Sequence, residues 1–203
     1  MSFVTDISER RGIVEIVADG ATVARVRKAN YEKCPVNTGE DIDVDAYLDR
    51  VAGAQFSDAY EAALTRLDAC ARSSKELADS LRRRGYVEPV IEAVVARLTE
   101  NGLIDDAQYA LRVAQLQSTK PVGVYAVRRK LRAKGISDED AEEALAAFDD
   151  DQQRAACRAA AEKLWRKYEA LPRREARAKL SQALARRGFG WDAIETVTDE
   201  LVD

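Results

Sequence analysis

A six-residue pattern that recurs three times along the chain constrains the fold more than any other feature. Each copy, at residues 81–86, 131–136 and 184–189, has a leucine, three mostly basic residues, a glycine and a bulky apolar residue. The leucines are 50 and 53 residues apart, and an apolar stripe with helical spacing begins six residues past each glycine. The chain is therefore built from an internal repeat of small helical units.

The pattern is typical of the end of one helix and the start of the next. Basic residues complement the negative C-terminal dipole of a helix, and a glycine takes the left-handed position just after it. We expect the apolar residue after each glycine to fold back into the core. Ser73 with Glu76 forms a capping box, and Ser137 with Asp140 resembles a variant of one.

Three units of three helices are predicted. Alanine, leucine, arginine and glutamate, which are good helix formers, dominate from about residue 45 onward. The expected helices are 58–71, 74–84 and 88–101, then 106–117, 121–134 and 138–148, then 150–170, 173–187 and 191–202. The corresponding domains are 58–104, 105–148 and 149–203. A module of about 45 residues has too small a core to be secure alone, so neighbouring units should pack against each other.

Residues 1–52 are predicted to form a small β-rich element that contains a hairpin. Two apolar runs, 12–18 and 21–27, flank an Asp-Gly pair that favours a tight turn. A turn-rich acidic segment follows, and Gly53 marks a loose boundary before the helices. The predicted fold class is mainly α, an elongated curved array of three tandem three-helix repeats with this small β-rich N-terminal element.

Composition excludes most catalytic chemistry. The 203 residues include no histidine, which removes histidine triads, proton shuttles and histidine-ligated metals. Phosphate-binding loops and nucleophile elbows do not occur. Cys34, Cys70 and Cys157 are far apart and are expected to be isolated reduced thiols. We therefore expect no enzyme, no cofactor and no metal. No apolar run approaches the roughly 20 residues of a membrane span, so we expect a cytoplasmic protein without a membrane partner.

Basic side chains are concentrated in a few segments although the net charge is −4. Residues 120–134 carry six basic residues and no acid, and residues 173–187 carry six and one acid. Helix dipoles need only one or two cations in the last turn, so these segments are predicted to contact a partner or DNA. The predicted contact residues are Arg82, Arg83, Arg84, Arg128, Arg129, Lys130, Arg132, Lys134, Arg173, Arg174, Arg177, Arg186 and Arg187. Trp191 is expected to anchor the last helix, with an interface role as the alternative.

Several strings resemble the RecX family of regulatory proteins. They are Arg-Ser-Ser-Lys-Glu-Leu at 72–77, Leu-Thr-Glu-Asn-Gly-Leu-Ile-Asp-Asp-Ala-Gln-Tyr-Ala at 98–110, Gly123, and the pattern copies at 131–136 and 184–189. The resemblance covers nearly the whole chain, most tightly 60–148 and 176–201. It implies a cytoplasmic, non-enzymatic modulator of the RecA recombinase. Such a protein lies in the helical groove of the RecA–DNA filament and inhibits ATP hydrolysis, strand exchange and coprotease activity, which modulates DNA repair and the SOS response.

The resemblance implies the RecA filament as partner and, for some members, single- or double-stranded DNA. The repeats leave no unpaired apolar face, so a monomer is expected. Two alternatives remain open from the residues themselves. One is a sequence-tolerant DNA-binding protein of stacked helix-turn-helix-like modules that acts through phosphate contacts. The other is a repeat scaffold for a different partner.

Overall fold

A computed structural model describes residues 1–146 and 148–202 of the chain, which divides into two compact units. Unit 1 is Met1–Asp105 and unit 2 is Asp106–Asp203. Residue 147, within the predicted helix 138–148, and residue 203, within the predicted third domain, lie outside the described residues.

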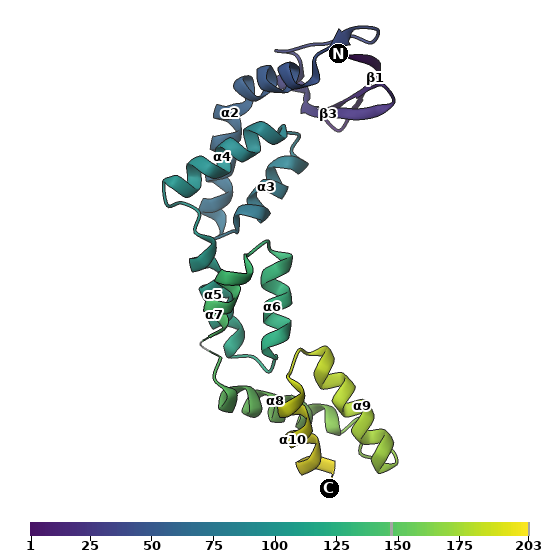
Figure 1. The fold of residues 1–203 in the computed structure, drawn as a ribbon, viewed down its shortest axis with the longest axis vertical. Coiled ribbons are helices and arrows are strands. Elements are labelled where there is room, and N and C mark those ends of the chain that lie inside the picture. The colour runs from purple at the N-terminus through teal and green to yellow at the C-terminus, as the bar shows by residue number, and fades with distance from the viewer. Residues whose placement is uncertain (147, 203) are drawn as a thin grey trace. The chain divides into compact units, whose positions relative to one another are not determined.

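Unit 1 consists of a small sheet followed by a three-helix group (Figure 1). Its elements are β1 (Ser2–Arg10), β2 (Ile13–Ala18), β3 (Ala21–Arg27), α1 (Lys28–Tyr31), β4 (Asp41–Ile42), α2 (Val44–Ala69), α3 (Ser74–Arg83) and α4 (Glu88–Glu100). A contiguous buried cluster extends from Val4 and Ile16 in the sheet to Tyr47 in α2 and Leu98 in α4. The β element therefore shares one hydrophobic core with the first three-helix group.

Unit 2 contains two further three-helix groups. They are α5 (Asp106–Ser118), α6 (Val124–Ala133) and α7 (Asp138–Leu145), then α8 (Asp150–Trp165), α9 (Arg173–Arg186) and α10 (Trp191–Val202). Each group has a buried cluster of its own, around Leu131 in one and Leu184 in the other. The predicted fold class, mainly α with three three-helix repeats and a small N-terminal sheet, is confirmed.

The sheet is antiparallel, with strand order β3-β2-β1-β4. The predicted hairpin is confirmed as β2 and β3, and Asp19 and Gly20 at its turn have φ angles of 51° and 79°. Strand β1 was not predicted from the sequence; it forms a second hairpin with β2 through Arg11 and Gly12, at φ 54° and 76°. The pattern of β1 is weak because most of its side chains are polar and exposed, and arginine is an unusual residue at such a turn.

Helix α2 begins at Val44, so the predicted start at 58 and the predicted boundary at Gly53 are both wrong. The side chain of Asp43 accepts a hydrogen bond from the Ala46 N–H and caps the helix. Gly53 lies inside the helix, where glycine costs about 1 kcal/mol relative to alanine. Burial of Tyr47, Val51 and residues further along the same face against the sheet and α4 offsets that cost.

The repeated six-residue pattern forms the expected helix ends. Gly85, Gly135 and Gly188 have φ angles of 80°, 80° and 83°. In each copy the glycine N–H bonds to the carbonyl three residues back, and the next N–H bonds to the carbonyl of the pattern's leucine. The apolar residue after each glycine is buried, as predicted. Both Ser73 and Ser137 cap helices through their hydroxyls. Other predicted ends differ by a few residues: α6 begins at Val124, α7 ends at Leu145 and α8 ends at Trp165.

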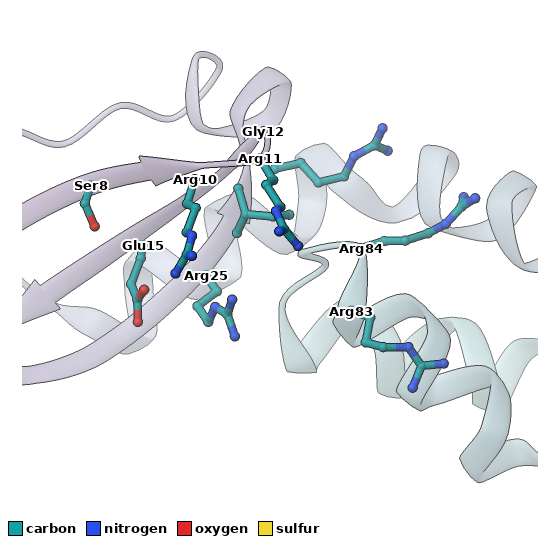
Figure 2. Close-up of a pocket in the computed structure, with 10 residues that line it drawn as sticks. Ser8, Arg10, Arg11, Gly12, Glu15, Arg25, Arg83 and Arg84 are labelled. Carbon is teal, nitrogen blue, oxygen red and sulfur yellow. The ribbon is translucent and has the colours of Figure 1, made fainter.

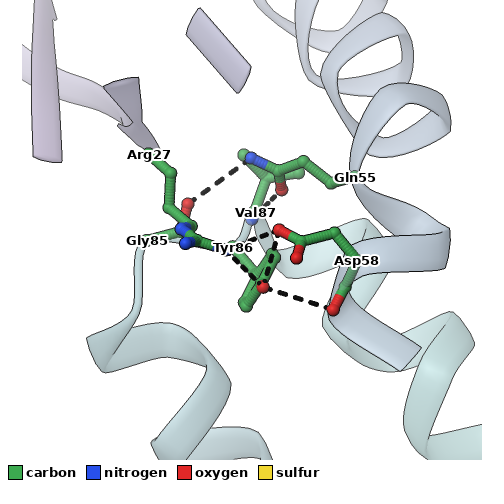
Figure 3. A network of polar contacts seen from close by, with 6 residues as sticks. All are labelled: Arg27, Gln55, Asp58, Gly85, Tyr86 and Val87. Carbon is green, nitrogen blue, oxygen red and sulfur yellow. Dashed lines mark hydrogen bonds and ion pairs between the residues drawn. The ribbon is translucent and has the colours of Figure 1, made fainter. Parts of the chain in front are cut away.

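The sheet is joined to the end of α3 by a polar network (Figure 3). The Arg27 guanidinium donates to the Asp58 carboxylate (2.5 Å) and to the Tyr86 hydroxyl (2.7 Å), and the hydroxyl donates to the same carboxylate (2.9 Å). The fully buried Gln55 accepts from the Val87 N–H at 2.9 Å and donates to the Gly85 carbonyl at 3.5 Å. Burial and the Asp58 contact raise the pKa of Tyr86. The network fixes β3 against the α3–α4 connection.

The three cysteines are free thiols that differ in exposure, which predicts their reactivity. Cys70 is exposed, whereas Cys157 is buried, and burial raises the pKa of the Cys157 thiol to about 11. Because the thiolate is the reactive form, Ellman's reagent at mildly alkaline pH should modify Cys70 in the native protein and Cys157 only after denaturation. Rapid native reaction of a Cys34→Ala/Cys70→Ala variant would contradict the buried position of Cys157.

Candidate functional site

The structure distributes the predicted basic contact residues over several environments. Arg82 is occupied within the protein, because its guanidinium donates to Asp79 (2.6 Å) and to both carboxylate oxygens of Glu88 (2.5 and 2.9 Å). Its role in the fold is to join the last turn of α3 to the first turn of α4. Arg83 and Arg84 remain exposed at the end of α3.

The basic residues of α9 are spread along the length of the helix. Arg173 and Arg174 lie at the start of the helix and Arg186 at its end, and a helix of 14 residues is about 20 Å long. Arg177 forms an ion pair with Asp199 of α10. Arg187 follows the helix end, and its backbone carbonyl accepts a hydrogen bond from the N–H of Gly123, the residue just before α6.

Three arginines of α6, Arg128, Arg129 and Arg132, line a hollow of unit 2, which we call the aromatic–arginine groove. The groove has a volume of about 490 Å³. Its lining residues are Tyr125, Arg128, Arg129, Arg132, Ala185, Phe189, Gly190 and Trp191. It thus joins side chains of the second three-helix group to side chains of the third.

The groove exists because the backbone of α6 packs directly on the connection between α9 and α10. The first N–H groups of α6 lack a side-chain cap from their own segment. Instead the Gly123 N–H donates to the Arg187 carbonyl (3.0 Å) and the Tyr125 N–H donates to the Gly188 carbonyl (3.1 Å). The Val124 N–H donates to the side-chain carbonyl of Gln153 in α8 (3.0 Å). The third group therefore supplies the N-terminal cap of α6.

Glycine is required on both sides of this contact. A Cβ at Gly123 would lie 2.0 Å from the Gly188 carbonyl oxygen, and a Cβ at Gly188 would lie 2.2 Å from the Ala126 nitrogen. Both neighbours are backbone atoms, which cannot move aside as a flexible side chain can. The role of Gly123 is therefore to permit close approach of the two groups.

The arginines of the groove are partly neutralised. Arg128, with a side chain only 27% exposed, pairs with Glu142 (2.8 Å) and lies over the Tyr125 ring. Arg132 pairs with Asp138 (2.7 Å), and this contact lowers the pKa of the Asp138 carboxyl. Arg129 donates to the Arg186 carbonyl at 3.3 Å. Since Arg128 is packed, changing its charge would disturb the fold as well as the surface.

Two of the basic residues of this segment lie outside the groove lining. Lys130 is exposed, and Lys134 lies over the ring of Tyr109 in α5, with its nitrogen 5.3 Å from the ring centre. The predicted contact residues of 128–134 are thus divided between the groove and the flank of the second group.

Trp191 occupies a different position from the one expected. It is the first residue of α10 and is 67% exposed, so the prediction that it anchors the last helix is wrong. Phe189, two residues earlier, occupies the core instead. Tyr125, also in the groove, is 50% exposed. No local pattern in the sequence singles out Tyr125, because only the docking of α6 on the α9–α10 connection brings it into one groove with Trp191.

Neither a metal cluster nor a membrane-spanning helix is found in the described ranges 1–146 and 148–202. No group there places three or more Cys, Asp or Glu side chains where they could hold a metal ion. No helix among these residues is long and apolar enough to cross a membrane.

All three helical groups match domains of one protein family. Residues 59–98 match the RecX first three-helix domain, residues 105–145 the second and residues 150–198 the third. These segments together cover more than half of the chain.

Comparison with individual proteins also finds RecX proteins, in two cases over nearly the full length of this chain. The chain is 30% identical to the regulatory protein RecX of Bacillus subtilis, over 99% of this chain and 78% of that protein. It is similar to a crystal structure of regulatory protein RecX, with a TM-score of 0.69 and 26% identity over 98% of this chain and all of that one. A crystal structure of RecX from Lactobacillus salivarius aligns with a TM-score of 0.65 and 33% identity, over 73% of this chain and 97% of the other.

Proposed function

The chain belongs to the RecX family of regulatory proteins, and on this premise we propose that it binds the RecA–DNA filament in the filament's helical groove. Bound there, it inhibits ATP hydrolysis, strand exchange and coprotease activity, and thereby modulates DNA repair and the SOS response. It acts by binding alone, as a monomer in the cytoplasm, and not as an enzyme.

The observation that carries this proposal is the composition of the aromatic–arginine groove. Tryptophan, tyrosine and arginine are the residues that dominate the binding energy of protein–protein interfaces. Trp191, Tyr125 and Arg129 lie together here, with their charged and aromatic groups facing a hollow. An exposed tryptophan at a helix start contributes little to the free energy of folding. Its large apolar surface would instead contribute to the free energy of binding when a partner covers it.

The construction of the groove also favours a protein partner. Its two walls are joined by backbone hydrogen bonds and by the glycine contact, so little conformational entropy is lost when a partner binds. The pairs of Arg128 with Glu142 and of Arg132 with Asp138 leave only part of its positive charge free. A mixed aromatic and partly neutralised surface fits a protein with apolar and acidic side chains better than bare phosphate.

The test is a RecA DNA-dependent ATPase assay with the purified full chain and an Arg129→Glu/Trp191→Ala variant. We expect the chain to inhibit and the variant to need at least about 30-fold more protein for the same inhibition, which corresponds to a loss of about 2 kcal/mol at an interface hot spot. Both side chains are exposed, so the variant should melt like the parent.

An Arg112→Glu/Leu116→Ala variant is the matched control, because it changes one exposed arginine and one exposed apolar residue on α5, away from the groove. It should inhibit like the parent chain. Absence of inhibition by the parent chain would overturn the proposed function. Undiminished inhibition by the groove variant would overturn the assignment of the groove.

A further inference from the structure

One tyrosine of the chain differs from the others in its accessibility. All seven tyrosines lie in the described residues. The side chain of Tyr125 is 50% exposed, whereas the other six are buried or of intermediate exposure. Within the ranges 1–146 and 148–202, the Tyr125 hydroxyl makes no hydrogen bond. Its oxygen is therefore accessible to an enzyme that modifies tyrosine.

The same tyrosine begins a stripe of arginines on α6. Arg128, Arg129 and Arg132 follow it by three, four and seven residues, and a helix places such positions on one face. All four side chains line the aromatic–arginine groove, and no acidic residue lines it. The Arg128 guanidinium lies 5.5 Å from the centre of the Tyr125 ring. An anionic group on the Tyr125 oxygen would therefore have guanidinium groups of its own helix beside it.

These arginines keep donors that their present contacts do not use. A guanidinium group carries five N–H donors. Arg132 contacts Asp138 through its Nε–H, and Arg129 donates to the Arg186 carbonyl at 3.3 Å. The Nε atom of Arg128 is buried and has no acceptor among the described residues. The groove therefore combines positive charge and unused donors with a free hydroxyl.

We propose that Tyr125 is a phosphorylation site and that Arg129 and Arg132 hold its phosphoryl group. A tyrosine kinase supplies the group from ATP. The Tyr125 oxygen forms a bond to the γ-phosphorus, the bond from that phosphorus to the β–γ bridging oxygen breaks, and ADP leaves. The hydroxyl proton passes to the catalytic base of the kinase. The product carries a charge of about −1.5 to −2 at pH 7 and three acceptor oxygens, which guanidinium groups match in geometry.

Phosphorylation would change what the groove binds, and this consequence rests on the proposed function. The unmodified groove offers Arg129 and the exposed Trp191 ring to a partner. A phosphate on Tyr125 neutralises Arg129 and places negative charge opposite the acidic side chains of that partner, so the two surfaces repel. Modification of Tyr125 therefore weakens binding and relieves inhibition.

The first test detects the modification in cells. The full chain is recovered from its native cells in the presence of phosphatase inhibitors, before and after DNA damage, and its tryptic peptides are analysed by mass spectrometry. We expect phosphate on Tyr125 in the peptide 113–128, which contains no other tyrosine. Detection of this peptide only in its unmodified form, under both conditions, would overturn the proposal.

The second test measures contact with the arginines and needs no RecA. Phosphotyrosine is incorporated at position 125 of the full chain, and the phosphate is titrated by phosphorus NMR. The second pKa of a phosphate ester is ordinarily about 6, and neighbouring guanidiniums should lower it by at least about 0.5. Arg129→Gln/Arg132→Gln should return the pKa to the value of free phosphotyrosine. A pKa equal to that of free phosphotyrosine in the parent chain would contradict the proposed contact.

The matched control removes two arginines from a different hollow. Arg10 and Arg25 are exposed and line an arginine-rich hollow of unit 1, as Figure 2 shows. Arg10→Gln/Arg25→Gln in the phosphorylated chain changes the net charge by the same amount and should leave the pKa of the phosphate as low as in the parent. An equal rise with both variants would mean that net charge and not contact sets the pKa, against the proposed site.

The RecA DNA-dependent ATPase assay separates this proposal from the proposed function. If the unmodified chain inhibits, the chain phosphorylated at Tyr125 should need at least about tenfold more protein for the same inhibition, because a charge-assisted contact is replaced by repulsion. Equal inhibition by the two forms would refute regulation of the groove by phosphate. Absence of inhibition by the unmodified chain would overturn the proposed function, while the pKa of the phosphate still tests the site.

Discussion

Replacing Gly188 with alanine is expected to lower the free energy of unfolding of unit 2 by about 3 kcal/mol or more. Two costs combine at this position. The φ angle of 83° is unfavourable for any residue with a Cβ, and that Cβ would lie 2.2 Å from the Ala126 backbone nitrogen. Relief of the overlap moves the α9–α10 connection away from α6. Urea denaturation followed by circular dichroism measures the loss, and hydrogen exchange at the Gly123 and Tyr125 amides should accelerate.

Two other glycines separate the costs. Gly123→Ala tests close approach alone, because its φ of −83° suits alanine while its Cβ would overlap the Gly188 carbonyl. Gly102→Ala tests the backbone angle alone, because Gly102 has φ 67° and open space around it. We expect a loss of about 1 kcal/mol for Gly102→Ala and a larger loss for Gly123→Ala. Equal losses at Gly102 and Gly188 would show that the two helical groups do not depend on backbone contact.

The second large effect is expected at the leucines of the repeated pattern. Leu131 is completely buried and packs with Val127 and Ile136 in the core of the second group. Leu131→Ala should lower the free energy of unfolding by about 2–5 kcal/mol, since it removes buried methyl groups and leaves a cavity. The equivalent changes at Leu81 and Leu184, which are also fully buried, should have effects of the same size.

Leu116→Ala provides the comparison for these changes. Leu116 is in α5 of the same unit and is 65% exposed, so its replacement should alter the free energy of unfolding by less than about 0.5 kcal/mol. Urea denaturation measures the loss in free energy of unfolding for each variant. Because the substitution is the same at Leu131 and Leu116, the difference between the two losses reports the contribution of core burial. Losses of similar size at the two positions would contradict the assignment of the repeated leucine to the core.

The sequence by itself determined the features that depend on neighbours in the chain. The repeated leucine-to-glycine pattern predicted the helix ends, because a left-handed residue after a basic last turn is decided within six residues. The capping by Ser73 and the turn at Asp19 and Gly20 are local in the same sense, and all were confirmed.

Only the tertiary structure decided what depends on residues far apart in the chain. Helix α2 continues through Gly53 because its face packs on the sheet and α4, and β1 exists because β2 pairs with it despite a weak pattern. Trp191 is exposed because Phe189 fills the core. Some arginine partners are equally non-local: Arg27 pairs with Asp58 of α2, 31 residues further along the chain, and Arg158 pairs with Glu200, 42 residues further along. Charge runs in a sequence identify basic segments, but for such arginines the packing of distant elements decides which carboxylate comes within reach.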